Sequence, residues 1–255
     1  MVNASFKPGE VNDIYTDSLY NSGKITSYSQ RASASERNFN GRGLAFGLKH
    51  LFPKEGEELT VDANYFSGNN KGNALYTTNN YSGNTINNTQ LQKILSDGSD
   101  HNLMLQADYT KPFSAVTKLE TGVRGAFRSR INNNYNYMFS KTAGDYSLVP
   151  SATSNYSNTD NVYAAYVTVS SSVKDFSYKI GLRAESSSYS GVLKTTGRQY
   201  NNQYPVSLFP SVFLSQKLSP DQDLQLSYTR RVNRPNFFQL IPFADSTDKL
   251  NITKG

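Results

Sequence analysis

Apolar and polar residues alternate with a period of two along most of this chain. The stretch 176–185 shows the pattern most clearly, because Ile180, Leu182 and Ala184 alternate with Lys179, Gly181, Arg183 and Glu185. A period of two places the two sets on opposite faces of a β-sheet. The pattern therefore predicts strands with one apolar face and one polar, charged face.

The predicted strands come in pairs that are closed by short turns and separated by long polar stretches. The pairs are 43–52 with 58–66, 102–111 with 118–131, 161–173 with 176–188, and 205–218 with 224–232. The stretches between them, 67–100, 132–160 and 189–204, are rich in Asn, Ser and Tyr and are predicted to be loops. Short turns on one side and long loops on the other are typical of an outer-membrane β-barrel. We therefore expect an all-β, antiparallel, up-and-down transmembrane β-barrel segment with long outward loops.

Part of one long stretch has the residue spacing of a helix. Leu91, Ile94 and Leu95 follow helical spacing, and Asn88 or Thr89 is a suitable N-cap. The spacing predicts a short helix over 89–96, resting over the mouth of the barrel.

The composition agrees with a membrane wall. Aromatic residues make up 13% of the chain while hydrophobic residues make up only 36%, which is little for a thick soluble core. Aromatic residues also occur near predicted strand ends, where two interfacial girdles would place them, although Tyr and Phe favour strands in general. The expected girdles are Phe52, Phe113 and Phe176 beside the tight turns and Tyr65, Phe66, Phe127 and Tyr189 toward the long loops.

Charge and cysteine content narrow the function classes. The net charge of +6 is spread along the chain and no nucleic-acid-binding signature occurs, so no nucleic-acid partner is expected. The absence of cysteine excludes disulfides. No apolar run reaches 18 residues, so no transmembrane helix is predicted. A strand of a membrane barrel needs only about ten residues, half of them polar. The mean hydropathy of −0.59 is therefore compatible with a location in a membrane.

The sequence offers no catalytic or metal-binding pattern. The two histidines, His50 and His101, have no carboxylate or cysteine at metal-ligand spacing, and no nucleophile elbow, phosphate-binding loop or dinucleotide-binding fingerprint occurs. We expect no metal, no cofactor and no enzymatic activity.

The two ends of the sequence suggest a piece of a larger protein. Residues 1–5 have neither a basic nor an apolar signal region, and 251–255 end without an aromatic-terminated strand. We expect a single partial barrel region over 1–255. Within it, 1–40 form a strand end and an outward loop, 41–232 the four strand pairs with short periplasmic turns, and 233–255 a further outward loop.

Several motifs in the last third of the chain carry a family resemblance. They are Gly-Leu-Arg-Ala-Glu at 181–185, Phe-Pro-Ser at 209–211 and Ser-Tyr-Thr-Arg-Arg-Val-Asn-Arg-Pro at 227–235. In these motifs the chain resembles the barrel of TonB-dependent receptors of the Bacteroidetes outer-membrane β-barrel type. The resemblance continues more weakly back to about Asn38.

That resemblance implies a bacterial outer-membrane barrel of about 22 strands, closed by a plug domain and driven by the TonB system. We expect this chain to supply about eight to ten of those strands and to carry neither the plug nor the TonB-contacting box. The implied function is uptake into the periplasm of a large nutrient such as a glycan, a peptide or a metal chelate. The implied partners are outer-membrane lipid, the plug, the TonB system and a surface lipoprotein.

Two sets of candidate site residues follow. Within the resemblance, the inner wall facing the plug would be formed by Arg124, Arg128, Arg183, Glu185 and Arg231, unless these arginines are merely solvated. The outward loops combine amides with aromatic rings, the pairing used to hold sugars and peptides. The candidate ligand-facing residues are Tyr81, Tyr135, Tyr137, Asn202, Tyr204, Phe237 and Phe238, although Phe237 and Phe238 would also suit anchoring of a loop.

Two other functions compete with nutrient uptake. The first is an outer-membrane barrel that serves adhesion or assembly and transports nothing. The second is a soluble, secreted all-β binding module, in which the apolar faces would pack as a sandwich. The alternatives differ in where the apolar side chains lie, because a sandwich buries them in a dry centre and a barrel wall leaves them on its outer surface.

Overall fold

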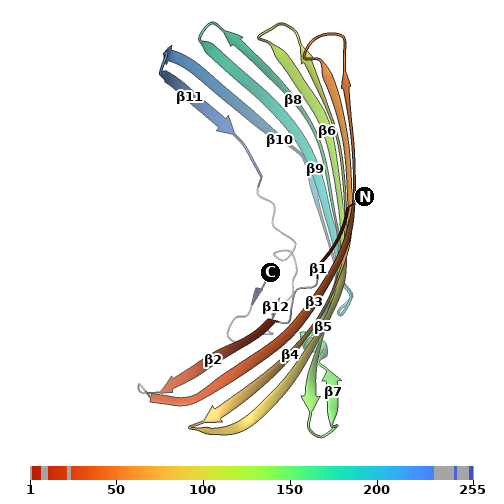
Figure 1. Cartoon of the computed structure of the whole chain (residues 1–255), viewed down its shortest axis with the longest axis vertical. Coiled ribbons are helices and arrows are strands. Elements are labelled where there is room, and N and C mark those ends of the chain that lie inside the picture. The colour runs from red at the N-terminus through yellow and green to blue at the C-terminus, as the bar shows by residue number, and fades with distance from the viewer. Residues whose placement is uncertain (1, 7–10, 22–23, 233–243, 246–252, 255) are drawn as a thin grey trace.

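The structure is a computed structural model that describes residues 2–6, 11–21, 24–232, 244–245 and 253–254. Figure 1 shows its main body as one long sheet that curves into an open trough. The strands are β1 Val2–Phe6, β2 Val11–Asn21, β3 Lys24–Leu51, β4 Glu58–Ser82, β5 Thr85–Pro112, β6 Lys118–Ser140, β7 Asp145–Leu148, β8 Ser154–Val173, β9 Phe176–Leu193, β10 Arg198–Ser219, β11 Gln222–Thr229, β12 Ala244–Asp245 and β13 Thr253–Lys254. A 3₁₀ turn, η1 Pro150–Ala152, precedes β8.

The strands pair antiparallel with their neighbours in the chain. The sheet has the order β1-β3-β4-β5-β6-β8-β9-β10-β11, with β2 also paired to β3 and β7 also paired to β6. This up-and-down order confirms the expected fold class. The first and last strands of the order are not hydrogen-bonded to each other, so the sheet is open.

The sheet is a single layer. Apart from the two-stranded β12–β13 pair, all described strands belong to it. Ile180, Leu182 and Leu105 are between 42% and 50% exposed, and the described residues include no large side chain that is fully buried. A sandwich would require these side chains in a dry centre, so the structure does not support the soluble binding module.

All four predicted tight turns are present, at the upper end of the trough in Figure 1. The chain reverses over 52–57, 113–117, 174–175 and 220–221. Gly56 has φ +77°, in the left-handed region that favours glycine, and the Phe52 amide donates to the Glu57 carbonyl at 3.0 Å. Residues with turn preference therefore set these strand ends.

The predicted long loops are mostly strands. The ladder between β4 and β5 continues from Glu58↔Thr110 as far as Ser82↔Thr85, so 67–100 is an extended hairpin with a two-residue turn. Stretches 132–160 and 189–204 likewise lie mainly in β6, β8, β9 and β10, with β7 and η1 between them. The helix expected over 89–96 is wrong, because these residues pair with β4 inside β5. Continuous backbone pairing outweighs the low strand preference of Asn, Ser and Gly.

The first forty residues are also largely strand. β1 and β2 pair with successive parts of β3, which itself begins at Lys24. These pairings place 24–40 in the same extended hairpins that form the lower end of Figure 1. Most of 233–255 lies outside the described residues.

The sheet has two chemically different faces. The apolar face carries a belt of exposed hydrophobic side chains that spans the strands near the tight turns. The polar face carries the residues between them along each strand, including the charged ones. Residues paired across successive strands from β3 to β10 form rows on each face. One row of the apolar face consists of Leu48, Val61, Ala107, Val123, Ala165, Ala184 and Leu208. The neighbouring row of the polar face consists of Gly47, Asp62, Gln106, Arg124, Ala164, Glu185 and Ser207.

Aromatic rings cover glycines on the polar face. A Cβ on Gly68 would lie 2.9 Å from the Phe39 ring and 3.1 Å from the Phe66 ring. Phe66 therefore lies on the polar face, and the register places Tyr189 there too, opposite Asp160. The expectation that these two contribute to the outer girdle was wrong, whereas Tyr65 and Phe127 do lie on the apolar face.

Candidate functional site on the polar face

The polar face collects most of the predicted inner-wall residues. Arg124 and Arg128 come from β6, and Arg183 and Glu185 come from β9, one strand beyond β8. All four occupy positions in the strands that alternate with the exposed apolar side chains. The pleat of the sheet thus brings them to one surface.

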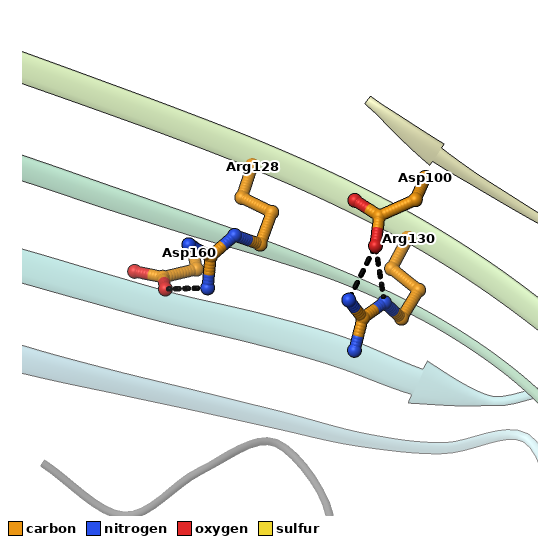
Figure 2. A network of polar contacts seen from close by, with 4 residues as sticks. All are labelled: Asp100, Arg128, Arg130 and Asp160. Atoms are coloured by element: carbon orange, nitrogen blue, oxygen red, sulfur yellow. Dashed lines mark hydrogen bonds and ion pairs between the residues drawn. The ribbon is translucent and has the colours of Figure 1, made fainter. Parts of the chain in front are cut away.

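Two arginine–aspartate pairs bridge neighbouring strands, as Figure 2 shows. Arg128 Nη1 lies 3.8 Å from Asp160 Oδ2 on β8. Arg130 donates from Nε to Asp100 Oδ2 on β5 at 2.9 Å, and its Nη2 contacts the same oxygen. Both pairs are partly exposed, so they orient the side chains more than they stabilise the sheet.

The acidic residue Glu185 is held more tightly. Arg183 Nη2 donates to Glu185 Oε2 at 2.7 Å, and Arg183 Nε donates to the same oxygen at 3.0 Å. Glu185 is buried, with 7% of its surface exposed. A buried carboxylate needs such a cation, because removing a charge from water is costly unless it is paired.

Arg124 differs from the other predicted arginines. It is exposed, and no ion pair or hydrogen bond of its side chain occurs among the described residues. In register it faces Gln106 on β5, and Gln106 faces Asp62 on β4. The Asp62 carboxylate likewise has no hydrogen bond or ion pair within the described part of the chain. The polar face therefore presents one available cation and one available anion in the same row.

The remaining predicted wall residue lies at the edge. Arg231 follows β11 in an exposed, non-strand segment. The structure does not bring it next to the arginines of β6 and β9. Its neighbour Arg230 donates its amide to the Pro210 carbonyl at 3.1 Å, which ties this segment to β10.

The predicted ligand-facing residues do not form one cluster. Tyr81, Tyr135 and Tyr137 occupy apolar-face positions of β4 and β6, beyond the hydrophobic belt. Tyr81 stacks on Tyr28 with a centroid distance of 4.4 Å and donates to Gln30. Phe237 and Phe238 lie outside the described residues.

Asn202 and Tyr204, by contrast, lie together on the polar face of β10. In register Asn202 faces Tyr189 and Tyr204 faces Ser187, both on β9. The Tyr204 and Tyr189 rings meet edge to face at 5.9 Å. Tyr189 in turn faces Asp160, the partner of Arg128. An amide, two aromatic rings and an ion pair therefore share one region of the polar face.

A polar chain across the extended hairpins was not foreseen. The Arg31 guanidinium lies 4.2 Å from the centroid of the Tyr76 ring and donates to Gln92 Oε1 at 3.1 Å. Gln92 Nε2 then donates to Asn136 Oδ1 at 3.0 Å. These residues were assigned to loops, and only the extended strand register shows that four strands align them.

The most buried part of the described chain lies at the base of the β7 hairpin, beyond the belt. Asn136, Thr153 and Tyr156 are each at most 5% exposed, and the Asn136 amide donates to Thr153 Oγ1 at 3.2 Å. Burial raises the pKa of the Tyr156 hydroxyl to about 12. This packing fixes the root of an extended hairpin.

Neither a metal cluster nor a membrane-spanning helix is found in the part of the chain that the structure describes. No group of three or more His, Cys, Asp or Glu side chains lies close enough to hold an ion there. No described helix is long and apolar enough to cross a bilayer.

A single antiparallel sheet with one exposed apolar face and one charged face defines the wall of a membrane β-barrel. The family model of the outer membrane protein beta-barrel family matches residues 50–255. The chain belongs to this family, and its location is the bacterial outer membrane.

Solved structures with a similar fold are outer-membrane receptors and transporters, at low identity. The unliganded ferric citrate transporter FecA is 10% identical, with 88% of this chain and 42% of that chain covered and a TM-score of 0.43. The alcaligin outer-membrane receptor FauA from Bordetella pertussis is 14% identical, with 89% of this chain and 42% of that chain covered and a TM-score of 0.39. The ferric yersiniabactin uptake receptor FyuA from Yersinia pestis is 11% identical, with 88% of this chain and 43% of that chain covered and a TM-score of 0.34. This chain spans less than half the length of these proteins, and the TM-scores are too low to support a functional conclusion. No curated protein matches the chain.

Proposed function

We propose that the chain forms part of the barrel wall of a TonB-dependent, energy-coupled receptor that imports a large nutrient. The nutrient classes that suit such a receptor are a glycan, a peptide or a metal chelate. The observation that carries the proposal is the polar face, which presents charged and aromatic side chains on the side opposite the lipid-facing belt. The role is one of binding and passage, without catalysis.

The open sheet supports a wide barrel. Its outer strands, β1, β2 and β11, leave backbone groups without a partner in the described sheet, and lipid offers none. Further strands of the whole protein would close the wall. Barrel diameter grows with strand number, and barrels of about 22 strands enclose a lumen wide enough to need a plug.

The polar face suits contact with such a plug. Arg128, Arg130 and Arg183 already have carboxylate partners within the wall. Arg124 has an available guanidinium, which binds carboxylates and carbonyl groups in a planar, two-pronged geometry. We expect a plug carboxylate or carbonyl group at Arg124.

The extended hairpins suit a role on the cell surface. β4 and β5 continue for more than a dozen residues beyond the hydrophobic belt, which ends near Tyr65 and Leu103. Asn202, Tyr204 and Tyr189 lie on the polar face at the foot of these hairpins and are the candidate first contact for a ligand. A surface lipoprotein partner would cover the hairpins from outside.

Uptake by the intact gene product tests the proposal. Cells that carry the intact gene or a deletion are compared over minutes for uptake of labelled oligosaccharides, peptides and iron chelates, with and without a protonophore that removes the energy source. We expect one class to need both the gene and the energy source. The Arg124→Glu variant should reduce that uptake at least tenfold, whereas Lys54→Glu in an exposed tight turn should not. Uptake that is independent of the gene for every member of the panel would refute the proposal.

A further inference from the structure

A groove crosses the apolar face from β4 to β10. Its volume is about 670 Å³, and almost all of its surface is apolar. Ala63, Ala107 and Ala165 lie along its floor because they are short, and Leu105 and Tyr163 rise beside them. Tyr163 is braced by the Phe127 ring, edge to face at 5.5 Å. The depression is thus bounded by large side chains on a face that meets lipid.

The groove lies in the half of the belt nearer the extended hairpins. The belt continues from Ala107 toward the tight turns as far as Val173 and Phe176, which lie well outside the groove. β4 and β10 are five strand spacings apart in the sheet, or about 24 Å at roughly 4.8 Å each. One leaflet of hydrocarbon is about 15 Å thick, so an acyl chain of one lipid covers somewhat more than half of the length of the groove.

Hydrogen-bond donors lie on the same face, just beyond the end of the groove that is nearer the extended hairpins. Arg42, Ser67 and His101 are in register on β3, β4 and β5. The next row toward the belt contains Tyr65 and Leu103 and is the first hydrophobic one. The donors therefore sit where the hydrocarbon region gives way to head groups.

The geometry of this donor cluster suits an anion. The Tyr65 hydroxyl lies 3.3 Å from His101 Nδ1. When Nδ1 accepts from the tyrosine, Nε2 carries the ring proton and donates outward. Arg42 is exposed and forms no ion pair among the described residues. A guanidinium, an imidazole N–H and a hydroxyl are a suitable set of donors for a phosphate group.

We propose that this face holds one phosphate-bearing membrane lipid, with its phosphate at Arg42, Ser67 and His101 and an acyl chain in the groove. Ser67 and Ala63 are four residues apart on β4, or about 13 Å, which leaves room for the glycerol or sugar backbone and the first methylene groups. Both a glycerophospholipid and a phosphorylated glycolipid such as lipid A have this chemistry. The site depends on the location in the outer membrane and not on transport.

Native mass spectrometry of the protein purified from outer membranes in a mild detergent tests the proposal. The probes are dipalmitoyl phosphatidylglycerol, lipid A and dipalmitoylglycerol, which has the same tails as the first probe and no phosphate. We expect one or both phosphate-bearing lipids to bind at least tenfold more tightly than dipalmitoylglycerol. Comparison of the first two probes identifies the source. Equal binding of all three lipids would show an unspecific lipid shell and overturn the proposal.

Variants separate the two halves of the site. Arg42→Gln combined with His101→Gln should weaken phosphate-bearing lipid at least tenfold, whereas Lys71→Gln, farther along the same face, should not. Ala107→Leu combined with Ala165→Leu fills the groove and should weaken all three lipids, whereas Val169→Leu on the belt outside it should not. Unchanged binding in the Arg42 and His101 double variant, which leaves the belt intact, is sufficient to refute the site.

Discussion

The two-face architecture predicts opposite outcomes for arginine at two adjacent positions of β8. Val167 lies on the apolar face with 42% of its surface exposed, and Thr168 lies on the polar face directly opposite Glu120. Both positions are at the same depth in the membrane. Only the face differs.

The expected magnitudes follow from the environment of each face. Arginine on the lipid face of a barrel costs about 2–4 kcal/mol at the midplane of the bilayer. Val167 is near the middle of the belt, so Val167→Arg should lower the free energy of unfolding by about that amount. At roughly 1.4 kcal/mol per factor of ten, the ratio of folded to unfolded protein falls about 30- to 700-fold. Thr168→Arg places its guanidinium in an aqueous interior near Glu120 and should change stability by less than about 1 kcal/mol.

Urea unfolding in phospholipid vesicles measures both variants, with the heat-dependent shift in gel mobility reporting the folded barrel. Val167→Lys serves as a second lipid-face variant, to show that the cost comes from charge and not from side-chain shape. Equal destabilisation at Val167 and Thr168, or a larger cost at Thr168, would refute the assignment of faces.

Three further predictions concern the polar face and the extended hairpins. Gly122→Ala should destabilise the sheet by about 1–3 kcal/mol in urea unfolding, because its Cβ would lie 2.7 Å from the Tyr166 ring; an unchanged midpoint would contradict this contact. Burial raises the pKa of Tyr156 to about 12, so ultraviolet titration of Tyr156→Phe should show one phenol fewer ionising near pH 12 than the wild type does. Since burial favours the neutral phenol, the stability that Tyr156 contributes should be constant below pH 10 and be lost as the pH rises toward 12; an ultraviolet titration of the variant that is identical to that of the wild type would refute this. A double-mutant cycle on Arg130 and Asp100 should give a coupling of about 0.5–1 kcal/mol that falls in high salt, and zero coupling at low salt would contradict the pair in Figure 2.

The sequence was sufficient for the part of the fold that the membrane constrains. Inside the belt, the contrast between Leu182 and Arg183 fixes which side of the strand faces lipid, and Pro53, Gly56 and the pair at 174–175 set the turns. Local preference and the period-two pattern therefore agree there. The strand ends at the tight turns were predicted to within about two residues.

The strands of the extended hairpins could not be predicted from the sequence, for a physical reason. Their residues have low strand preference, and both faces are polar, so no periodicity remains to reveal a strand. Pairs such as Asn79↔Thr89 form because the hairpin continues a ladder that starts inside the membrane. The same lack of contrast explains why Tyr135 and Tyr204 were grouped together although they lie on opposite faces.

Alternation along the strands predicted which residues share the polar face, but not the contacts that they make there. Alternation placed Arg124, Arg128 and Arg183 on one face, which the register reproduces. It could not show which of them the wall itself neutralises, because that depends on neighbours such as Asp160, which is distant in the sequence.

Whether an arginine of the polar face already has a carboxylate partner determines how strongly it can bind a further group inside the barrel. An arginine that already has a carboxylate partner must lose that contact before it binds another, so its net gain is small. Arg124 has no such contact to lose among the described residues, and Asp62 offers the opposite charge two strands away in the same row. A bound segment with complementary charges would therefore gain most at this row. The paired arginines beside it keep the overall electrostatic field of the wall low, which favours orientation of a partner over mere attraction.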